Sequence, residues 1–498
     1  MNFRSRFQVL ILIPSLLGLW MLSPQGRVEP ADWIMEGGLV YTMDAARSSA
    51  EALAIRDGMI AYVGSGGGAE RFRGPETRRL SLEGKMALPG FHDAHVHPAT
   101  GGLRQVQCIL DGLETAAAVL EAIETYARTN PDEEWILGGG WDLPLFPQAN
   151  PRKETLDRLV PDRPVYLRAA DGHSAWVNSR ALQMAGVDAS SPDPPNGRIE
   201  RDADSGEPTG TLRESAMYLV ADVIPPPSIQ DYQDGIARSL DMANRFGITS
   251  MQDAAASPDI LRAYDRLRRE GRLTARVVAA QSVSPEGGVA QFDEMEEGRR
   301  RFQSERLRAT AAKIFVDGVI EAQTAALLEP YLHHGDWRGE PNLSPEMLNL
   351  FTKELSDRGF QIHFHAIGDR AVRMSLNAVE VSWQAGGKGN LRHHVSHLQL
   401  IDPADIPRFM DLGVIANFQP LWAYPDNYIE ELTVPFLGPE RSRWLYPIRS
   451  VFAAGAVVVA GSDWSVSSMN PLDAIEVAVT RQSPRIEGGD ILFQEERV

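Results

Sequence analysis

Cysteine is almost absent from this chain of 498 residues, which contains Cys108 and no other cysteine. A single thiol excludes an intrachain disulfide and a zinc site built from cysteines. Basic residues are also few: the chain has 49 Lys and Arg but 67 Asp and Glu, which gives a formal net charge of −18. A chain with this charge repels nucleic acid and anionic membrane surfaces. We therefore expect no nucleic-acid partner.

The N-terminus carries an apolar run that is short for a membrane span. Residues 7–22 are apolar and follow Arg4 and Arg6, whereas a confident span needs about 20 residues. A basic start before such a run is typical of an export signal, although no clear small-x-small cleavage site follows it. We expect residues 1–28 to be a signal peptide or an N-terminal anchor. The protein would then be exported, periplasmic or extracellular, or attached to a membrane through this segment.

The composition is otherwise that of a soluble globular protein, with 43% hydrophobic and 23% charged residues. The length favours one large domain and one smaller domain. Residues 29–88 contain short apolar runs separated by Gly, Asp and Ser, and Arg56-Asp57-Gly58 is a good hairpin signal. We predict that this segment forms the N-terminal part of a small β-sandwich-like domain.

From residue 89 to 498, apolar strands alternate with helical stretches. This alternation predicts parallel strands with crossover helices, and a (β/α)8 TIM-type barrel fits the size. The spacing breaks between about 100 and 228, where Pro and Gly are dense, so we predict an insertion over the barrel mouth. The expected strands are 86–91, 165–169, 248–252, 275–280, 312–316, 360–365, 394–398, 414–417 and 456–461.

Histidines and one aspartate follow several of these strands. His95 and His97 are spaced by two, which places both imidazoles on one face of an extended segment and suits a metal pair. In the run that contains His363 and His365, we favour His365, because barrel enzymes build their sites at the C-terminal strand ends. His363 would be a core residue or would support a ligand.

Two further strand ends complete the predicted ligand set. His397 is favoured over His393 and His394 for the same reason, and Asp463 follows a buried, β-branched run. An acidic residue at that exit is well placed as a metal ligand and proton carrier. Lys313 lies at the start of a core strand. A lysine in such a position usually buries its alkyl chain and keeps its ammonium group in solvent. A lysine that faces a barrel interior can instead lose its charge and be modified.

These residues lie in a pattern of motifs that resembles a known family. The segment 88–97, Leu-Pro-Gly-Phe-His-Asp-Ala-His-Val-His, resembles the first-strand signature of the amidohydrolase superfamily. The rest is similar to its amidohydrolase-3 branch, which contains N-substituted formamide deformylases. The similarity runs from about residue 32 to the end of the chain. The other matching segments are 138–142, 171–179, 206–210, 365–369 and 461–464.

The resemblance implies a divalent metal in one or two copies, and histidine and carboxylate ligands favour zinc. His95 and His97 would bind one metal, His365 and His397 would bind on the opposite side, and Asp463 would complete the set. Lys313 falls where related enzymes carry a carboxylated lysine that bridges two metals. Asp317, at the far end of the same strand, is a competing acidic candidate and also a candidate substrate contact.

The resemblance also implies residues near the substrate. His173, in the insertion, resembles a family histidine that lies beside the substrate, while a solvent-facing loop residue is the alternative. Trp141 and Asp142 are candidates of the same kind. Trp422 and Trp464, near strand exits, would line an apolar pocket or pack in the core.

The chain departs from the family in two places. Relatives usually continue past the region that matches 484–498 with strands that complete the small β domain, so we expect that domain to be incomplete here, with unpaired strand edges. Ser396 stands where many relatives have an acidic residue. Stability and activity are the properties that the short tail puts in question.

The expected chemistry is metal-assisted hydrolysis of a small non-peptide amide. Asp463 would carry the proton from the attacking water to the leaving nitrogen, and His173 would bind the developing oxyanion. Deamination, ester hydrolysis or isomerisation on the same site are alternatives. A further alternative is an exported metal-binding or ligand-binding protein without turnover.

Overall fold

The computed structural model describes residues 28–46, 48–387, 389–486 and 488–498. The chain divides into two compact units, one that ends at Pro89 and one that spans Gly90–Val498. Residues 1–27 of the predicted export segment lie outside the described ranges, so that assignment stays a prediction. Within the described ranges, no helix is both long enough and apolar enough to span a lipid bilayer.

The first unit is built on one five-stranded sheet, in the order β3-β2-β1-β4 with β5 paired to β1. The predicted hairpin is present, because Asp57 and Gly58 both have positive φ and join the antiparallel strands β2 and β3. The strands are β1 (Trp33–Tyr41), β2 (Ser49–Arg56), β3 (Met59–Gly64), β4 (Arg78–Ser81) and β5 (Met86–Ala87).

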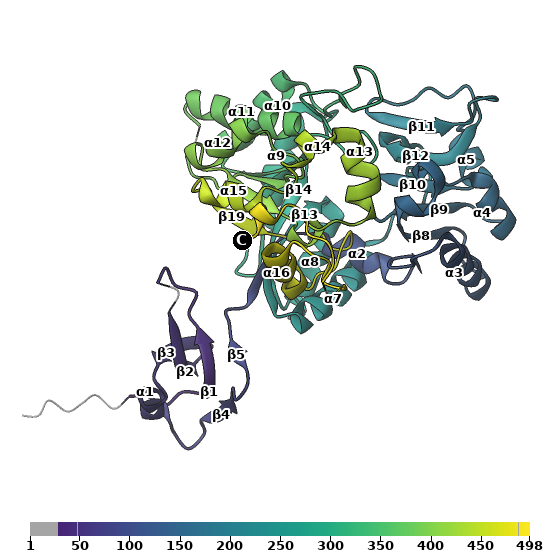
Figure 1. Cartoon of the computed structure of the whole chain (residues 1–498). Helices are drawn as coiled ribbons and strands as arrows, with labels where there is room; N and C mark the ends of the chain where they lie inside the picture. Colours follow the sequence, from purple (N-terminus) through teal and green to yellow (C-terminus); the bar gives the residue numbers. More distant parts are fainter. Residues whose placement is uncertain (1–27, 47, 388, 487) are drawn as a thin grey trace, which may run out of the picture. The chain divides into compact units, whose positions relative to one another are not determined.

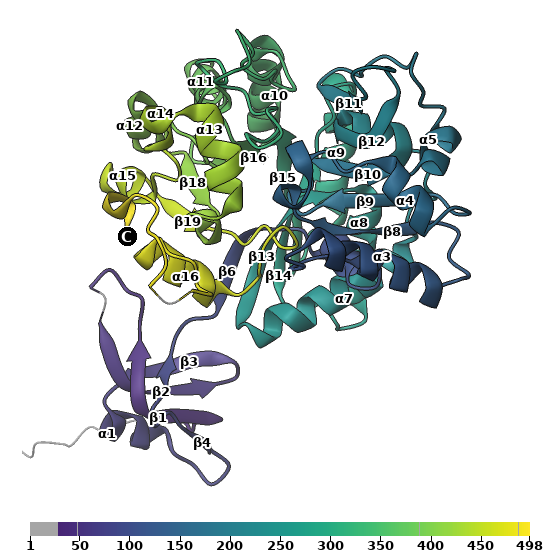
Figure 2. The same cartoon turned by 45° about the vertical axis from the view of Figure 1, so that its right-hand side comes forward.

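The second unit contains an eight-stranded parallel sheet, in the order β19-β18-β17-β16-β15-β14-β13-β6. Helices surround this sheet in both views (Figures 1 and 2). The Asp463 amide donates to the His95 carbonyl at 2.7 Å, which ties the chain after β19 back to β6. The strands are β6 (Phe91–Val96), β13 (Ile248–Ala256), β14 (Arg276–Ser282), β15 (Leu307–Phe315), β16 (Gln361–Ala366), β17 (His394–His397), β18 (Ile415–Phe418) and β19 (Val458–Ala460). The predicted (β/α)8 TIM-type barrel is confirmed.

The first barrel strand differs from the prediction in its position. Residues 86–91 do not form one strand, because β5 belongs to the small sheet and β6 begins only at Phe91. β6 then runs through His95 to Val96 because it pairs with β13 over this length. His95 therefore lies inside a barrel strand, and His97 is the residue that precedes helix α2 (Pro98–Arg104).

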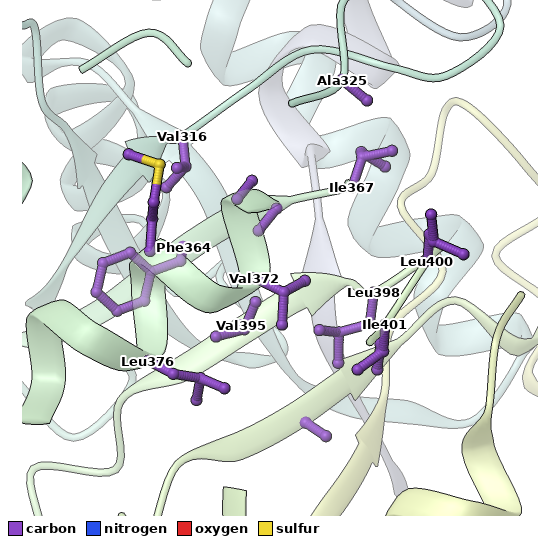
Figure 3. Packing of buried hydrophobic residues seen from close by; sticks show 14 of the residues in the cluster. Val316, Ala325, Phe364, Ile367, Val372, Leu376, Val395, Leu398, Leu400 and Ile401 are labelled. Carbon is purple, nitrogen blue, oxygen red and sulfur yellow. The ribbon is translucent and has the colours of Figure 1, made fainter. Parts of the chain in front are cut away.

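The barrel helices bury apolar faces against the strands. Figure 3 shows Val372 and Leu376 of α11 beside Phe364 of β16 and Val395 of β17, in the largest apolar cluster. Strands covered in this way are buried on both faces, which explains their apolar, β-branched sequences. The main helices of this layer are α7 (Ile229–Arg245), α8 (Pro258–Arg269), α9 (Gln291–Arg301), α10 (Pro345–Asp357), α11 (Asp369–Gln384), α12 (Ile406–Asp411), α15 (Ile448–Ala453) and α16 (Pro471–Thr480).

Between β6 and β13 the chain forms a second sheet of six strands, in the order β11-β12-β10-β9-β8-β7. Both views place this sheet beside the barrel, away from α11 and α12 (Figures 1 and 2). Its strands are β7 (Cys108–Ile109), β8 (Ile136–Trp141), β9 (Val165–Ala169), β10 (Ser174–Val177), β11 (Gly197–Arg201) and β12 (Pro208–Glu214), and its main helices are α3 (Ala116–Thr129), α4 (Lys153–Leu159) and α5 (Ser179–Ala185).

Candidate metal centre

Three of the predicted ligands meet at the C-terminal ends of barrel strands. His95 lies in β6, His397 ends β17, and Asp463 follows β19. Their candidate ligand atoms all lie within 4.8 Å of one another. One Asp463 oxygen is 3.4 Å from His95 Nε2, and the other is 3.7 Å from His397 Nδ1. Residues more than 360 positions apart in the sequence thus form one cluster.

His97 and His365 lie at the border of this cluster. His97 Nε2 is 3.1 Å from an Asp463 oxygen, and the His97 side chain is partly exposed. The ring of His365 is 4.3 Å from the ring of His397, measured between centroids. His365 Nε2 donates to the Gly318 carbonyl at 3.2 Å, because a carbonyl oxygen only accepts. Its Nδ1 therefore keeps the free lone pair.

The atoms that face one another in this cluster lack hydrogen-bond partners. Among the described residues, His95 Nε2, both ring nitrogens of His397 and one Asp463 oxygen are buried and unpaired. Burial lowers the pKa of His95 and of His397 well below the usual value, with nearby positive groups adding to the effect. Neutral imidazoles and a carboxylate are the forms that bind a divalent metal. Buried polar atoms left unpaired are costly, so the cluster fits a metal ion.

His363 contacts His95 and fixes the orientation of its ring. Its Nε2 lies 2.9 Å from His95 Nδ1 and 2.8 Å from the Ser396 hydroxyl. This contact occupies His95 Nδ1 and leaves His95 Nε2 directed toward Asp463. Partners of this kind fix the ring orientation of metal-binding histidines.

Lys313 is fully buried in β15, and its Nζ has no hydrogen-bond partner among the described residues. Burial lowers the pKa of Lys313 to about 7, although the Asp463 charge opposes this shift. A lysine of this pKa is partly uncharged at neutral pH, which is the reactive form of the amine. Its Nζ lies 4.7 Å from the centroid of the Phe315 ring.

Two cluster residues have backbone conformations that residues other than glycine rarely adopt. His397 has φ of 79° and Asp463 has φ of 51°, both in the left-handed region. For residues other than Gly this region costs free energy, and such residues gather at functional sites. The strained backbone turns both side chains into the cluster at the points where their strands end.

His173 reaches the barrel mouth from the insertion. Its ring centroid lies 5.3 Å from that of His365, and its Nδ1 is 2.9 Å from a Glu214 oxygen. The Glu214 carboxylate also accepts from the Thr324 hydroxyl at 2.6 Å. Burial lowers the pKa of His173, but the charge and hydrogen bond of Glu214 outweigh it, with help from Asp171, and raise the pKa to about 9.

Replacing Glu214 by glutamine is expected to lower the pKa of His173. Burial lowers this pKa, and the negative charge of Glu214, which is the largest effect that raises it, is then absent. In the parent protein, the raised pKa of His173 means that its protonation adds to the free energy of unfolding. This contribution is complete below pH 6.5 and is lost as the pH rises through about 9. NMR titration of the imidazole in metal-free protein measures the shift. Thr324→Val, which keeps the carboxylate, serves as the control. An unchanged His173 pKa in Glu214→Gln would show that the pair is not the cause.

Asp317 is held by backbone groups. Its carboxylate accepts from the amides of Ala326, Ile367 and Gly368 at 2.9 to 3.0 Å. Burial raises the pKa of Asp317 to about 7 against these hydrogen bonds. It lies 3.9 Å from His365 Nε2. With its oxygens engaged in this way, Asp317 fixes the loops around His365, which argues against its roles as a ligand and as a substrate contact.

The three aromatic and acidic candidates for substrate binding lie in different surroundings. Trp141 is fully buried in the core of the insertion, and its indole donates to the Leu167 carbonyl at 3.0 Å. Asp142 accepts from the Tyr428 hydroxyl at 3.1 Å. Trp422 stacks on His397, with centroids 5.6 Å apart and an interplanar angle of 5°. Of these three, Trp422 is in contact with the cluster, whereas Trp141 packs in the core.

Two polar residues of the site carry no recognisable signal in the sequence. Glu214 ends β12, close after the Gly206–Gly210 segment, and only the fold brings it to His173. Gln419 follows β18 and is fully buried. The apolar run before it and Pro420 after it mark the end of a strand. They do not show which way the amide points.

Comparisons with known proteins identify related sequences and structures. The model of the amidohydrolase family matches residues 80–498. Protein LONG AFTER FAR-RED 3 of Arabidopsis thaliana is 31% identical over 475 residues, 93% of this chain and 80% of that protein. N-substituted formamide deformylase of Arthrobacter pascens is 29% identical, over 89% of this chain and 82% of that protein. The crystal structure of an uncharacterized metal-dependent hydrolase from Pyrococcus furiosus matches with a TM-score of 0.71 and 26% identity, covering 94% of this chain and 91% of that one.

Proposed function

Because the chain belongs to the amidohydrolase family, we propose that it hydrolyses the C–N bond of small non-peptide amides with the help of a divalent metal. The observation that carries this proposal is the cluster of His95, His397 and Asp463, whose facing atoms are buried and unpaired. The relative from Arthrobacter pascens is an N-substituted formamide deformylase, which supports an N-formyl or N-acyl amine as the substrate.

The proposed metal ligands are His95, His97, His365, His397 and Asp463, with zinc as the proposed ion because imidazole and carboxylate ligands suit it. When bound, the metal supplies Lewis acidity that activates water and polarises a carbonyl. Lys313 would hold a second ion after its neutral amine adds to carbon dioxide and loses a proton, which yields a carbamate. The lowered pKa of Lys313 supports that reaction.

Asp463 carries the proton in this proposal. Its carboxylate takes a proton from the attacking water and delivers it to the departing nitrogen, which is general base and then general acid catalysis. His173 donates a hydrogen bond to the oxygen that becomes negative. The Glu214 pair keeps His173 protonated at neutral pH, because it raises the pKa of the ring to about 9. Trp422, stacked on His397, offers an apolar wall for the substituent on nitrogen.

A substrate panel tests the proposed function. The zinc-supplemented protein is offered an N-formyl amine, an N-acyl amine, an ester of the same acid, and an aminopurine. We expect release of free amine from the first two substrates at rates well above those for the ester and for deamination. If the metal-loaded protein released no amine from any amide, the proposed reaction would be wrong.

A further inference from the structure

Gln419 lies at the mouth of the barrel, between the strands that carry His397 and Asp463. Phe418, the residue before it, is in register with His397 of β17 on one side and with Ala460 of β19 on the other. Asn417, two residues earlier, contacts His394 Nδ1 at 3.1 Å inside the barrel. Because side chains two apart on a strand share a face, Gln419 faces the same way, one layer closer to the mouth.

The side-chain amide of Gln419 has no partner. The residue is fully buried, and among the described residues neither Nε2 nor Oε1 has a hydrogen bond. A glutamine amide donates through its nitrogen and accepts through its oxygen. Gln281, on β14, shows the usual arrangement, because its Nε2 donates to the Met295 and Ala309 carbonyls at 2.9 and 3.1 Å. A buried amide unpaired at both ends destabilises the free protein unless a ligand pairs with it.

We propose that Gln419 binds the amide group of the substrate, with Nε2 donating to an oxygen and Oε1 accepting the amide N–H. This inference rests on the proposed function and names a residue that selects its substrates. An amide with an N–H offers both an acceptor and a donor, as the unpaired Gln419 requires. An ester or an N,N-dialkyl amide offers only acceptors. Gln419 therefore makes the site prefer N–H amides over both.

The neighbouring turn supports this assignment. Gln419 begins the turn that contains Pro420 and Trp422, and Trp422 stacks on the predicted ligand His397. An amide-binding group and an apolar ring thus belong to one short segment beside the cluster. A substrate held by both would present its polar group and its apolar substituent to the same part of the barrel mouth.

Gln419→Met tests the proposal, because methionine keeps the length of the side chain and removes its polar atoms. Calorimetry on metal-free protein measures binding of an N-acyl amine and of the matching ester without turnover. We expect the Kd of the amide to rise by about 10- to 100-fold, as for a lost buried hydrogen-bond pair, and the Kd of the ester to stay within about twofold. The Tm should not fall, because the unpaired amide is gone.

Gln281→Met is the matched control, and there we expect a lower Tm, because two carbonyl groups lose their donor. Equal binding of amide and ester by the parent protein would overturn the proposal. The proposal would also be overturned if Gln419→Met raised the Kd of the amide and of the ester by the same factor, or if its Tm fell as far as that of Gln281→Met. Loss of metal from Gln419→Met would make the residue a ligand and also overturn it. The substrate panel tests the hydrolytic function separately, because it depends on turnover.

Discussion

Replacing Asp463 by asparagine is expected to lower kcat for amide hydrolysis by about 10²- to 10⁴-fold, the usual contribution of a general acid–base group. The carboxylate lies 3.1 Å from His97 Nε2 and 3.4 Å from His95 Nε2, so it is close to the imidazoles that would hold the metal. Asparagine has a similar shape but cannot accept the proton from water. The measurement is steady-state kinetics on the amide with the highest activity in the substrate panel.

The control for this variant is Asp357→Asn, which neutralises an exposed carboxylate paired with Lys353. That change should leave kcat unchanged, since surface ion pairs contribute little. Metal content of Asp463→Asn is measured in parallel, because Asp463 is also a proposed ligand. A variant that retained its metal and the full turnover of the parent protein would exclude Asp463 as the proton carrier.

The second large effect is expected from removing two imidazoles at once. His95→Ala combined with His397→Ala deletes two of the three residues whose ligand atoms lie within 4.8 Å of one another. We expect amide hydrolysis to fall below detection, because both proposed histidine pairs lose one imidazole and only His97, His365 and Asp463 remain to hold the ion. Steady-state rates and Tm are compared with those of His92→Ala, which alters an exposed histidine of the same strand.

The double variant also has a specific expectation for stability. In metal-free samples its Tm should fall less than for an ordinary large-to-small core substitution. The cavities and the lost contact between His95 and His363 lower the stability, but three buried nitrogens that lack partners are removed at the same time. Added zinc should raise the Tm of the parent protein, because an ion that binds the native state stabilises that state. It should leave the Tm of the double variant unchanged, because the variant lacks two of the proposed ligands. An equal zinc-dependent rise in both proteins would place the metal elsewhere.

The barrel and the gathering of His95, His397 and Asp463 could be predicted because they depend on local patterns. Apolar, β-branched runs mark buried parallel strands, and a histidine or aspartate at the end of such a run must appear at the barrel mouth. The choice of His365 over His363 rested on the same argument. In the structure His363 lies below His95 and contacts its Nδ1 at 2.9 Å, while His365 lies beside His397.

The surroundings of the site depend on contacts that the sequence does not encode locally. His173 meets Glu214 because two strands of the insertion sheet, β10 and β12, pair in one register. Trp141 and Trp422 are indistinguishable as aromatic residues near strand ends, yet one packs in a core and the other stacks on His397. Asp317 looks like a ligand in the sequence, but backbone amides occupy its carboxylate. Such pairings follow from tertiary structure alone.

Elemental analysis of the purified parent protein and of the double variant His95→Ala, His397→Ala is the most direct measurement. The proposed metal centre predicts one or two divalent ions per chain in the parent protein and none in the variant. A parent protein that hydrolysed amides at full rate without any bound metal would contradict it, and so would a variant that kept the parent's metal content.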